Sequence, residues 1–245
     1  MRLAILSDIH GNLLALETVL AHIEERGVDA IINLGDCVTS PLWPRETLEL
    51  LEAIDMPTVR GNHDRLLSET PIDNMPRSMR FTHDSLTAAQ RARLSALPPT
   101  VSLDGGILAM HGTLTSDKEY LLHDKIDGRL ALASGATLAA RLDGVDAALV
   151  LCGHSHHQHV GSCGTKCLVV NPGSVGCPRY TDDDDPVVAE SGSPHARYAI
   201  AERREGRWRV ELFALDYDWG AVVEQAIANG RSDFAAGFLG EHASA

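Results

Sequence analysis

The order of apolar runs and amphipathic segments in the first 61 residues restricts the possible folds more than any other feature. Residues 2–7, 29–35 and 57–61 are short apolar runs typical of buried strands. Residues 12–27 and 44–54, which lie between these runs, carry apolar side chains at helical spacing. Strands that alternate with helices in this order form a parallel sheet with helices packed against it. The sequence therefore predicts an α/β fold.

The rest of the chain predicts an insertion followed by a second group of strands. Residues 65–98 are polar and helical, and we expect them to form a small cap over one end of the sheet. Short strands dominate beyond residue 100, with one or two helices expected within residues 118–142 and a helical tail from residue 218. Because no repeat or linker divides the chain, residues 1–245 are predicted to form a single domain.

The charge and apolar content of the chain exclude several kinds of partner. The 34 acidic residues outnumber the 21 Lys and Arg residues, and the net charge of −13 repels a phosphate backbone, so nucleic acid is not an expected partner. No apolar run approaches the length of a membrane span, and the first residues do not resemble a signal peptide. We therefore expect a cytoplasmic protein without a membrane partner, whose oligomeric state the sequence leaves unknown.

The cysteines do not suggest a disulfide framework. An odd number, five, in a chain of this kind predicts reduced thiols. Cys163 and Cys167 have a spacing compatible with half of a zinc site, but no second cysteine pair follows them.

Side chains that can bind metals follow five of the apolar runs. Ligands of an open α/β sheet bind at the carboxyl ends of its strands, so these residues should meet at one rim. Each alone is compatible with a turn or a buried histidine, but the coincidence at five strand ends favours a metal site. In an extended chain, residues i and i+2 point the same way, so such pairs could reach a common point. The candidates are Asp8, His10, Asp36, Asn62, His63, His111, His154 and His156.

Taken in order, these residues resemble the five motifs of the calcineurin-like metallophosphoesterases. The matching stretches are D-x-H at Asp8, G-D at Asp36, G-N-H-D at Gly61, the single His111, and G-H-S-H at Gly153. The resemblance extends over residues 1–215, and residues 169–179 are similar to a segment of the small bacterial phosphodiesterase-like members. It implies a four-layer α/β/β/α sandwich with a small helical insertion over the active-site rim.

The resemblance also implies a centre of two divalent transition-metal ions. A carboxylate shared by both ions suits their separation of about 3.5–4 Å in such centres. Nitrogen and oxygen ligands are compatible with Mn, Fe, Zn, Co or Ni, of which we favour Mn or Fe. By the resemblance, one ion is held by Asp8, His10, Asp36 and His156, and the other by Asp36, Asn62, His111 and His154.

The G-N-H-D stretch is interpreted through the same resemblance. His63 would act as a general acid that protonates the leaving group. Asp64 would orient the His63 ring by accepting its other N–H, and Gly61 would let the backbone approach the metals. The implied activity is hydrolysis of a small phosphate mono- or diester, with hydroxide held between the ions as the nucleophile.

The sequence departs from some branches of the family and leaves two alternatives open. After Asp36 the chain lacks the arginine of the G-D-x-x-D-R-G motif, which disfavours protein phosphatase and symmetrical diadenosine tetraphosphatase activity. Many small phosphodiesterase-like members carry cysteine where His63 stands, so this chain should handle poorer leaving groups than they do. A non-catalytic metal-binding scaffold, which His63 disfavours, and a nucleotide pyrophosphohydrolase are the alternatives. A nuclease is disfavoured by the acidic charge and by an aromatic content of 4%.

A few further polar residues lie close to the motifs. His157 and His159 have the wrong parity to join His156, and we expect them at the surface or behind the ligands. Arg179 and Tyr180 are candidates for contact with a substrate phosphate. The acidic run at residues 181–186 is expected to be a solvated loop.

Overall fold

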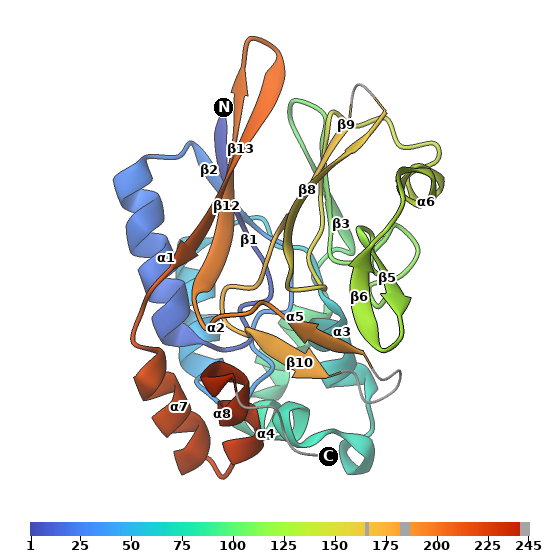
Figure 1. Cartoon of the computed structure of the whole chain (residues 1–245). Helices are drawn as coiled ribbons and strands as arrows, with labels where there is room; N and C mark the ends of the chain where they lie inside the picture. Colours follow the sequence, from blue (N-terminus) through green and yellow to red (C-terminus); the bar gives the residue numbers. More distant parts are fainter. Residues whose placement is uncertain (165–166, 182–186, 241–245) are drawn as a thin grey trace.

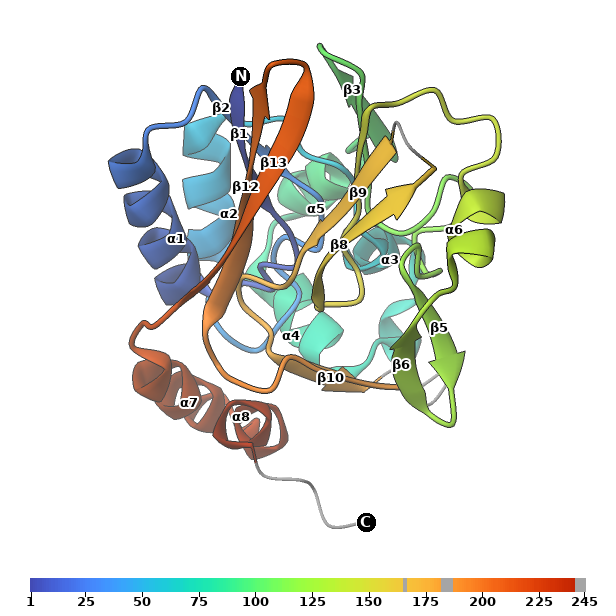
Figure 2. The ribbon, with the colours of Figure 1, turned by 45° about the horizontal axis from the view of Figure 1, so that its top comes forward.

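The computed structural model describes residues 1–164, 167–181 and 187–240. Two sheets face each other, and helices cover the outer side of each (Figures 1 and 2). The first sheet has the order β13-β12-β1-β2, in which β1 is parallel to β2 and antiparallel to β12. Its strands are β1 (Arg2–Leu6), β2 (Ala30–Asn33), β12 (Ala196–Arg204) and β13 (Arg207–Leu215).

The second sheet has the order β3-β4-β7-β9-β8, and its central strands β4, β7 and β9 run parallel. Its strands are β3 (Thr100–Leu103), β4 (Ile107–Met110), β7 (Leu149–Leu151), β8 (Gln158–Cys163) and β9 (Cys167–Pro172).

The period of two along each strand builds the core. In β1, Leu3 and Ile5 enter the apolar cluster between the two sheets, while Ala4 and Leu6 enter the cluster under the helices. Leu151 of β7 also lies between the sheets. Such alternation arises because residues i and i+2 of a strand share a face. Strands that are buried on both faces have continuous apolar sequences. This is why these strands could be predicted from the sequence.

The helices complete the four layers. On the first sheet, α1 (Leu13–Arg26), α2 (Pro44–Ile54), α7 (Trp219–Ala228) and α8 (Ser232–Leu239) contribute to one apolar cluster. On the second sheet, α6 (Gly135–Arg141) packs through Leu138. The predicted α/β/β/α sandwich is confirmed. Within the described residues, no helix is long and apolar enough to cross a membrane.

The predicted helical insertion is present. It consists of α3 (Asn62–Glu69), the short 3₁₀ helix η1 (Ile72–Asn74), α4 (Arg77–Ser85) and α5 (Ala88–Ser95). Leu67, Met79 and Leu94 anchor it in the apolar cluster of the first sheet. That this insertion acts as a cap, and that residues 1–245 form a single domain, remain predictions.

The structure departs from the predicted secondary structure in two segments. In the first, the one helix agrees with the prediction, but a hairpin was missed. Residues 118–142 contain one helix and also a hairpin, β5 (His123–Ile126) and β6 (Arg129–Leu132), that belongs to a third sheet with β10 (Arg179–Thr181) and β11 (Val188–Glu190). The hairpin turns at Asp127 and Gly128, which both have positive φ, as a two-residue Asp-Gly turn requires.

The second segment is residues 57–61, where the prediction of a third strand is wrong. These residues form only an isolated bridge between Thr58 and Asn33. Pro57 lacks a backbone N–H, which limits the ladder at this edge. The acidic residues 182–185 and the last residues 241–245 lie outside the described part of the chain.

Candidate metal centre

The structure brings all seven predicted ligands together. They lie on loops that follow β1, β2, β4 and β7 and on the first turn of α3, and none is more than 7% exposed. Donor atoms of three overlapping groups lie within 4.8 Å of one another. The groups are Asp8, His10 and Asp36; Asp36, His111 and His154; and His10, His156 and Cys177.

Five of these ligand positions have a left-handed backbone, with φ between 49° and 65°, which non-glycine residues rarely adopt. Each such residue costs roughly 1–3 kcal/mol, and such strain concentrates at functional sites. The positions are Asp8, His10, Asp36, His154 and His156. The expectation that ligand pairs i and i+2 converge in extended chain is therefore wrong in its reason, because they converge through turns beyond the strands.

Each carboxylate is held by one oxygen and presents the other. Oδ2 of Asp8 accepts the backbone N–H of His154 at 3.1 Å. Its buried Oδ1 has no hydrogen-bond partner among the residues that the structure describes and lies 3.3 Å from Nε2 of His156. An unpartnered carboxylate oxygen in a dry site is costly unless a cation occupies the space before it.

Asp36 follows the same pattern and lies between two histidines. Its Oδ1 accepts the backbone N–H of His63 at 2.9 Å. Its Oδ2 lies 3.8 Å from Nε2 of His10 and 3.4 Å from Nε2 of His111. This oxygen is therefore positioned to serve two ions at once.

Backbone carbonyls orient the histidines. In three of them Nδ1–H donates to a carbonyl, so Nε2 is the nitrogen that faces the centre and can bind a metal once any proton on it is released. The bonds join His10 to Thr39 (3.0 Å), His111 to Leu34 (2.8 Å) and His156 to Cys177 (2.7 Å).

His154 is oriented the opposite way. Its Nε2 lies 3.1 Å from the carbonyl oxygen of Lys118, so this nitrogen donates and Nδ1 is left to face the centre. Tyr120 stacks on the His154 ring with centroids 4.6 Å apart. The hydroxyl of Tyr180 donates to the His154 carbonyl at 3.0 Å and lies 2.8 Å from the hydroxyl of Tyr120. The suggestion from the sequence that Tyr180 contacts a substrate phosphate stays a prediction, and in the structure its hydroxyl supports His154.

The charges of the site are strongly coupled. Burial raises the pKa of Asp36, but the neighbouring His111 and His63 outweigh it, so the carboxyl stays ionised. Burial lowers the pKa of His111, but the charge of Asp36 outweighs it and raises the pKa to about 9. Ionised carboxylates in a buried site need counter-charge, which protons supply in the metal-free protein and divalent ions can supply instead. The donor set and its geometry thus fit two divalent ions.

His63 and Asp64 are not arranged as predicted. His63 is half-buried, its ring centroid is 5.3 Å from that of His10, and its buried Nδ1 has no hydrogen-bond partner. The carboxylate of Asp64 instead accepts the backbone N–H groups of Asp36 (2.9 Å), Cys37 (3.0 Å) and Gly61 (2.9 Å). The prediction that Asp64 orients the His63 ring through its N–H is wrong. Asp64 joins the loop after β2 to the start of α3, and so positions Asp36.

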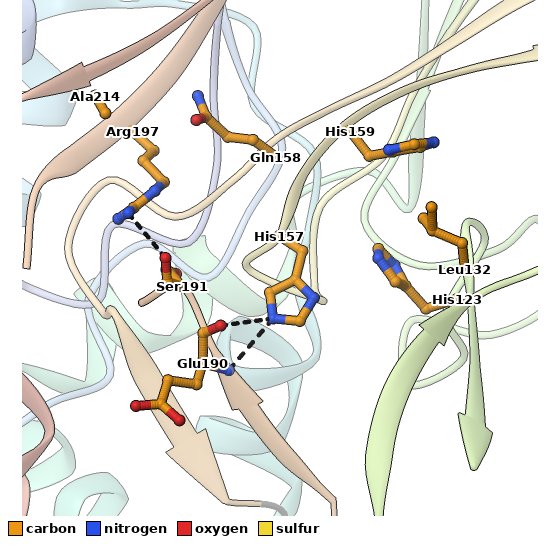
Figure 3. Close-up of a pocket in the computed structure, with 9 residues that line it drawn as sticks. All are labelled: His123, Leu132, His157, Gln158, His159, Glu190, Ser191, Arg197 and Ala214. Carbon is orange, nitrogen blue, oxygen red and sulfur yellow. Dashed lines mark hydrogen bonds between the residues drawn. The ribbon is translucent and has the colours of Figure 1, made fainter. Parts of the chain in front are cut away.

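A hollow of about 530 Å³ is lined in part by His157, the residue after the predicted ligand His156. Figure 3 shows His157, His123 and His159 gathered on one side of it. His157 Nε2 lies 3.0 Å from the Glu190 carbonyl oxygen, and burial lowers the pKa of this histidine. His157 and His159 were expected at the surface or behind the ligands, and both are half-buried and line this hollow.

Comparison with known proteins agrees with the site. Residues 1–191 match the model of the calcineurin-like phosphoesterase superfamily domain. The chain belongs to this superfamily. An uncharacterized protein of Methanocaldococcus jannaschii is 26% identical over 251 residues, which cover 93% of this chain and 92% of that protein.

Solved structures show the same fold over the whole chain. A metallophosphoesterase from Sphaerobacter thermophilus is 25% identical, with a TM-score of 0.72 over 98% of this chain and 99% of that one. A hypothetical protein from Pyrococcus horikoshii is 19% identical and has a TM-score of 0.79 over 99% of both chains, which shows the fold alone. The superfamily normally binds divalent metals, in keeping with the grouped Asp and His residues.

Proposed function

We propose that this chain is a phosphoesterase that hydrolyses phosphate mono- or diesters of small molecules with two divalent transition-metal ions, Mn or Fe being favoured. The observation that carries the proposal is the arrangement of Asp36, whose Oδ2 lies 3.8 Å from Nε2 of His10 and 3.4 Å from Nε2 of His111, while its Oδ1 is held by the backbone N–H of His63. One ion would be held by Asp8, His10, Asp36 and His156, and the other by Asp36, Asn62, His111 and His154.

Two such ions supply a nucleophile derived from water and neutralise charge on the phosphoryl oxygens. The chain contributes a rigid cradle, because the seven ligands are buried and the four histidines among them hydrogen-bond to backbone carbonyls. His63 lies beside this cradle on the first turn of α3, and no group in the described part of the chain forms a hydrogen bond with its Nδ1. It is therefore suited to carry a proton to the departing oxygen of the substrate.

The test is a substrate panel on protein stripped with a chelator and reloaded with Mn²⁺, Fe²⁺, Zn²⁺, Co²⁺ or Ni²⁺. Phosphate monoesters, diesters and nucleotide anhydrides should each be included, because all three fit the site. Hydrolysis that depends on added metal is expected. Bound ions without turnover of any substrate would instead support the alternative of a non-catalytic scaffold.

His63 is tested through the leaving group. General-acid help is worth about 10²–10⁴ in rate and matters most when the leaving alkoxide is a strong base. His63→Ala should thus cost little with a nitrophenyl ester and much with an alkyl ester, while metal content stays unchanged. His83→Ala, on α4, is the matched control and should change neither rate. An equal loss with both esters would mean that His63 binds substrate rather than donating a proton.

A further inference from the structure

Cys177 lies at the metal centre, although no motif of the sequence points to it. Its Sγ lies within 4.8 Å of ring nitrogens of His10 and His156, and the residue is 4% exposed. Among the described residues, it is the only cysteine grouped with Asp or His side chains in this way.

The backbone around Cys177 is fixed between two ligand loops. Its N–H donates to Oγ of Ser174 at 2.8 Å, and Ser174 in turn donates to the carbonyl of Asp8 at 2.7 Å. The carbonyl of Cys177 accepts Nδ1–H of His156 at 2.7 Å. The thiol is therefore carried to the centre by the segment that also orients His156.

Close packing prevents this segment from moving away. A Cβ on Gly176 would overlap the carbonyl oxygen of Ile9 and lie 2.6 Å from Cβ of Asn12, so the chain passes directly against the loop after β1. The N–H of Gly176 donates to the Asp8 carbonyl at 3.2 Å. The backbone of this segment therefore holds Cys177 beside His10 and His156.

We propose that Cys177 is a thiolate ligand of the ion held by Asp8, His10, Asp36 and His156, which rests on the function proposed above. The thiol donates at present to the carbonyl of Arg179 at 3.3 Å. When the ion binds, the S–H bond breaks, its proton leaves to solvent and a sulfur–metal bond forms, with no change in oxidation state. A bound divalent ion deprotonates a coordinating thiol outright.

A sulfur ligand changes which metals the site prefers. Thiolate favours softer ions such as Zn²⁺ or Fe²⁺, whereas an all-oxygen and imidazole site also accepts Mn²⁺ well. The two positions of the centre would then differ in character, since Asn62, His111 and His154 offer no sulfur to the second ion.

X-ray absorption on the zinc-loaded wild-type protein tests this directly. A sulfur scatterer at about 2.3 Å from zinc is expected, beside nitrogen and oxygen at about 2.0–2.2 Å. The sulfur shell should vanish in Cys177→Ser, which keeps a hydroxyl able to bond the Arg179 carbonyl. It should remain in the matched control Cys152→Ser, whose thiol is equally buried but outside the donor groups.

Cobalt substitution separates this inference from the proposed function. Binding of Co²⁺ is expected to give visible ligand-field bands and, from the thiolate, a near-ultraviolet charge-transfer band. Ligand-field bands without charge transfer in wild-type protein would overturn the role of Cys177 and leave the two-ion site intact. Absence of both, with no zinc retained, would overturn the metal centre itself.

Discussion

Replacement of Gly61 by alanine tests how closely the backbone must approach the metal centre. Gly61 has φ −81° and ψ 170°, which any residue adopts, so the substitution causes no backbone strain. A Cβ at this position would, however, overlap the backbone N and the carboxylate Oδ1 of Asp36 and lie 2.9 Å from its Cγ. The effect of the mutation on the folded state is therefore steric.

The magnitude follows from two opposing terms. Alanine restricts the unfolded chain and stabilises the fold by about 0.4–1 kcal/mol. Overpacking at a rigid site costs about 1–3 kcal/mol, and Asp36 cannot yield without loss of its bonds to His63 and Asp64. Gly61→Ala should therefore destabilise the metal-free fold by up to about 2.6 kcal/mol and weaken both ion sites, because the displaced carboxylate is the shared one.

Urea unfolding and metal titration of the stripped protein measure these effects. The matched control is Gly135→Ala, at the first residue of α6, where a Cβ meets nothing within 4 Å. This control should be neutral or stabilise the fold by up to about 1 kcal/mol. If Gly61→Ala behaves like Gly135→Ala in both assays, the close approach is not what this position requires.

Other changes probe the ligands and their protons. Asp36→Asn should deplete both ions in elemental analysis, whereas His10→Ala should mainly deplete one, and near-normal metal content in Asp36→Asn would refute the shared position. His156→Ala should lose metal while His157→Ala, the next residue, retains it; equal losses would place both near the ions. The raised pKa of His111, about 9, predicts that ion binding at neutral pH releases a proton, which calorimetry in buffers of different ionisation enthalpy measures. The same proton stabilises the metal-free fold below about pH 6.5, and this contribution is lost as pH rises through about 9, so the unfolding free energy should fall over that interval.

The elements with local signals were predictable from the sequence. The first helix, Leu13–Arg26, is capped by the two residues that its sequence indicated. The side chain of Asn12 accepts the N–H of Ala15, and Gly27 follows the helix in a left-handed conformation. The second helix is Pro44–Ile54, as predicted. The hairpin at Asp127 was missed although Asp-Gly is a strong hairpin signal, because the strands beside it are only four residues long and half-exposed.

The site residues were predictable as a set, and their supporting contacts were not. Ordered strand ends reveal which side chains reach the rim, since the fold places them there. The true partners of Asp64 are backbone N–H groups, which have no signature in a sequence. Cys177 follows His156 by 21 residues and reaches it only through the packing of two loops, so no spacing rule could have found it.

Backbone bonds between loops explain how the strained ligand positions persist. The N–H of Asp8 donates to the backbone carbonyl of Gly35 at 3.0 Å, and the N–H of His10 donates to the backbone carbonyl of Asp36 at 3.0 Å. These two bonds join the loops after β1 and β2. The N–H of Gly153 donates to His111 at 2.8 Å and joins the loops of the second sheet. The left-handed residues are therefore held from outside the centre, before any ion arrives.

Divalent ions bound at this site would link the two sheets through their ligands. Asp8 and Asp36 follow strands of the first sheet, whereas His111 and His154 follow strands of the second. An ion that takes ligands from both sheets stabilises the folded chain by the free energy of binding, which is about 4 kcal/mol when its concentration is 1,000 times the dissociation constant. The apolar layer between the sheets thus fixes where the ligand residues meet, and bound divalent ions would offset the cost of bringing two carboxylates together there.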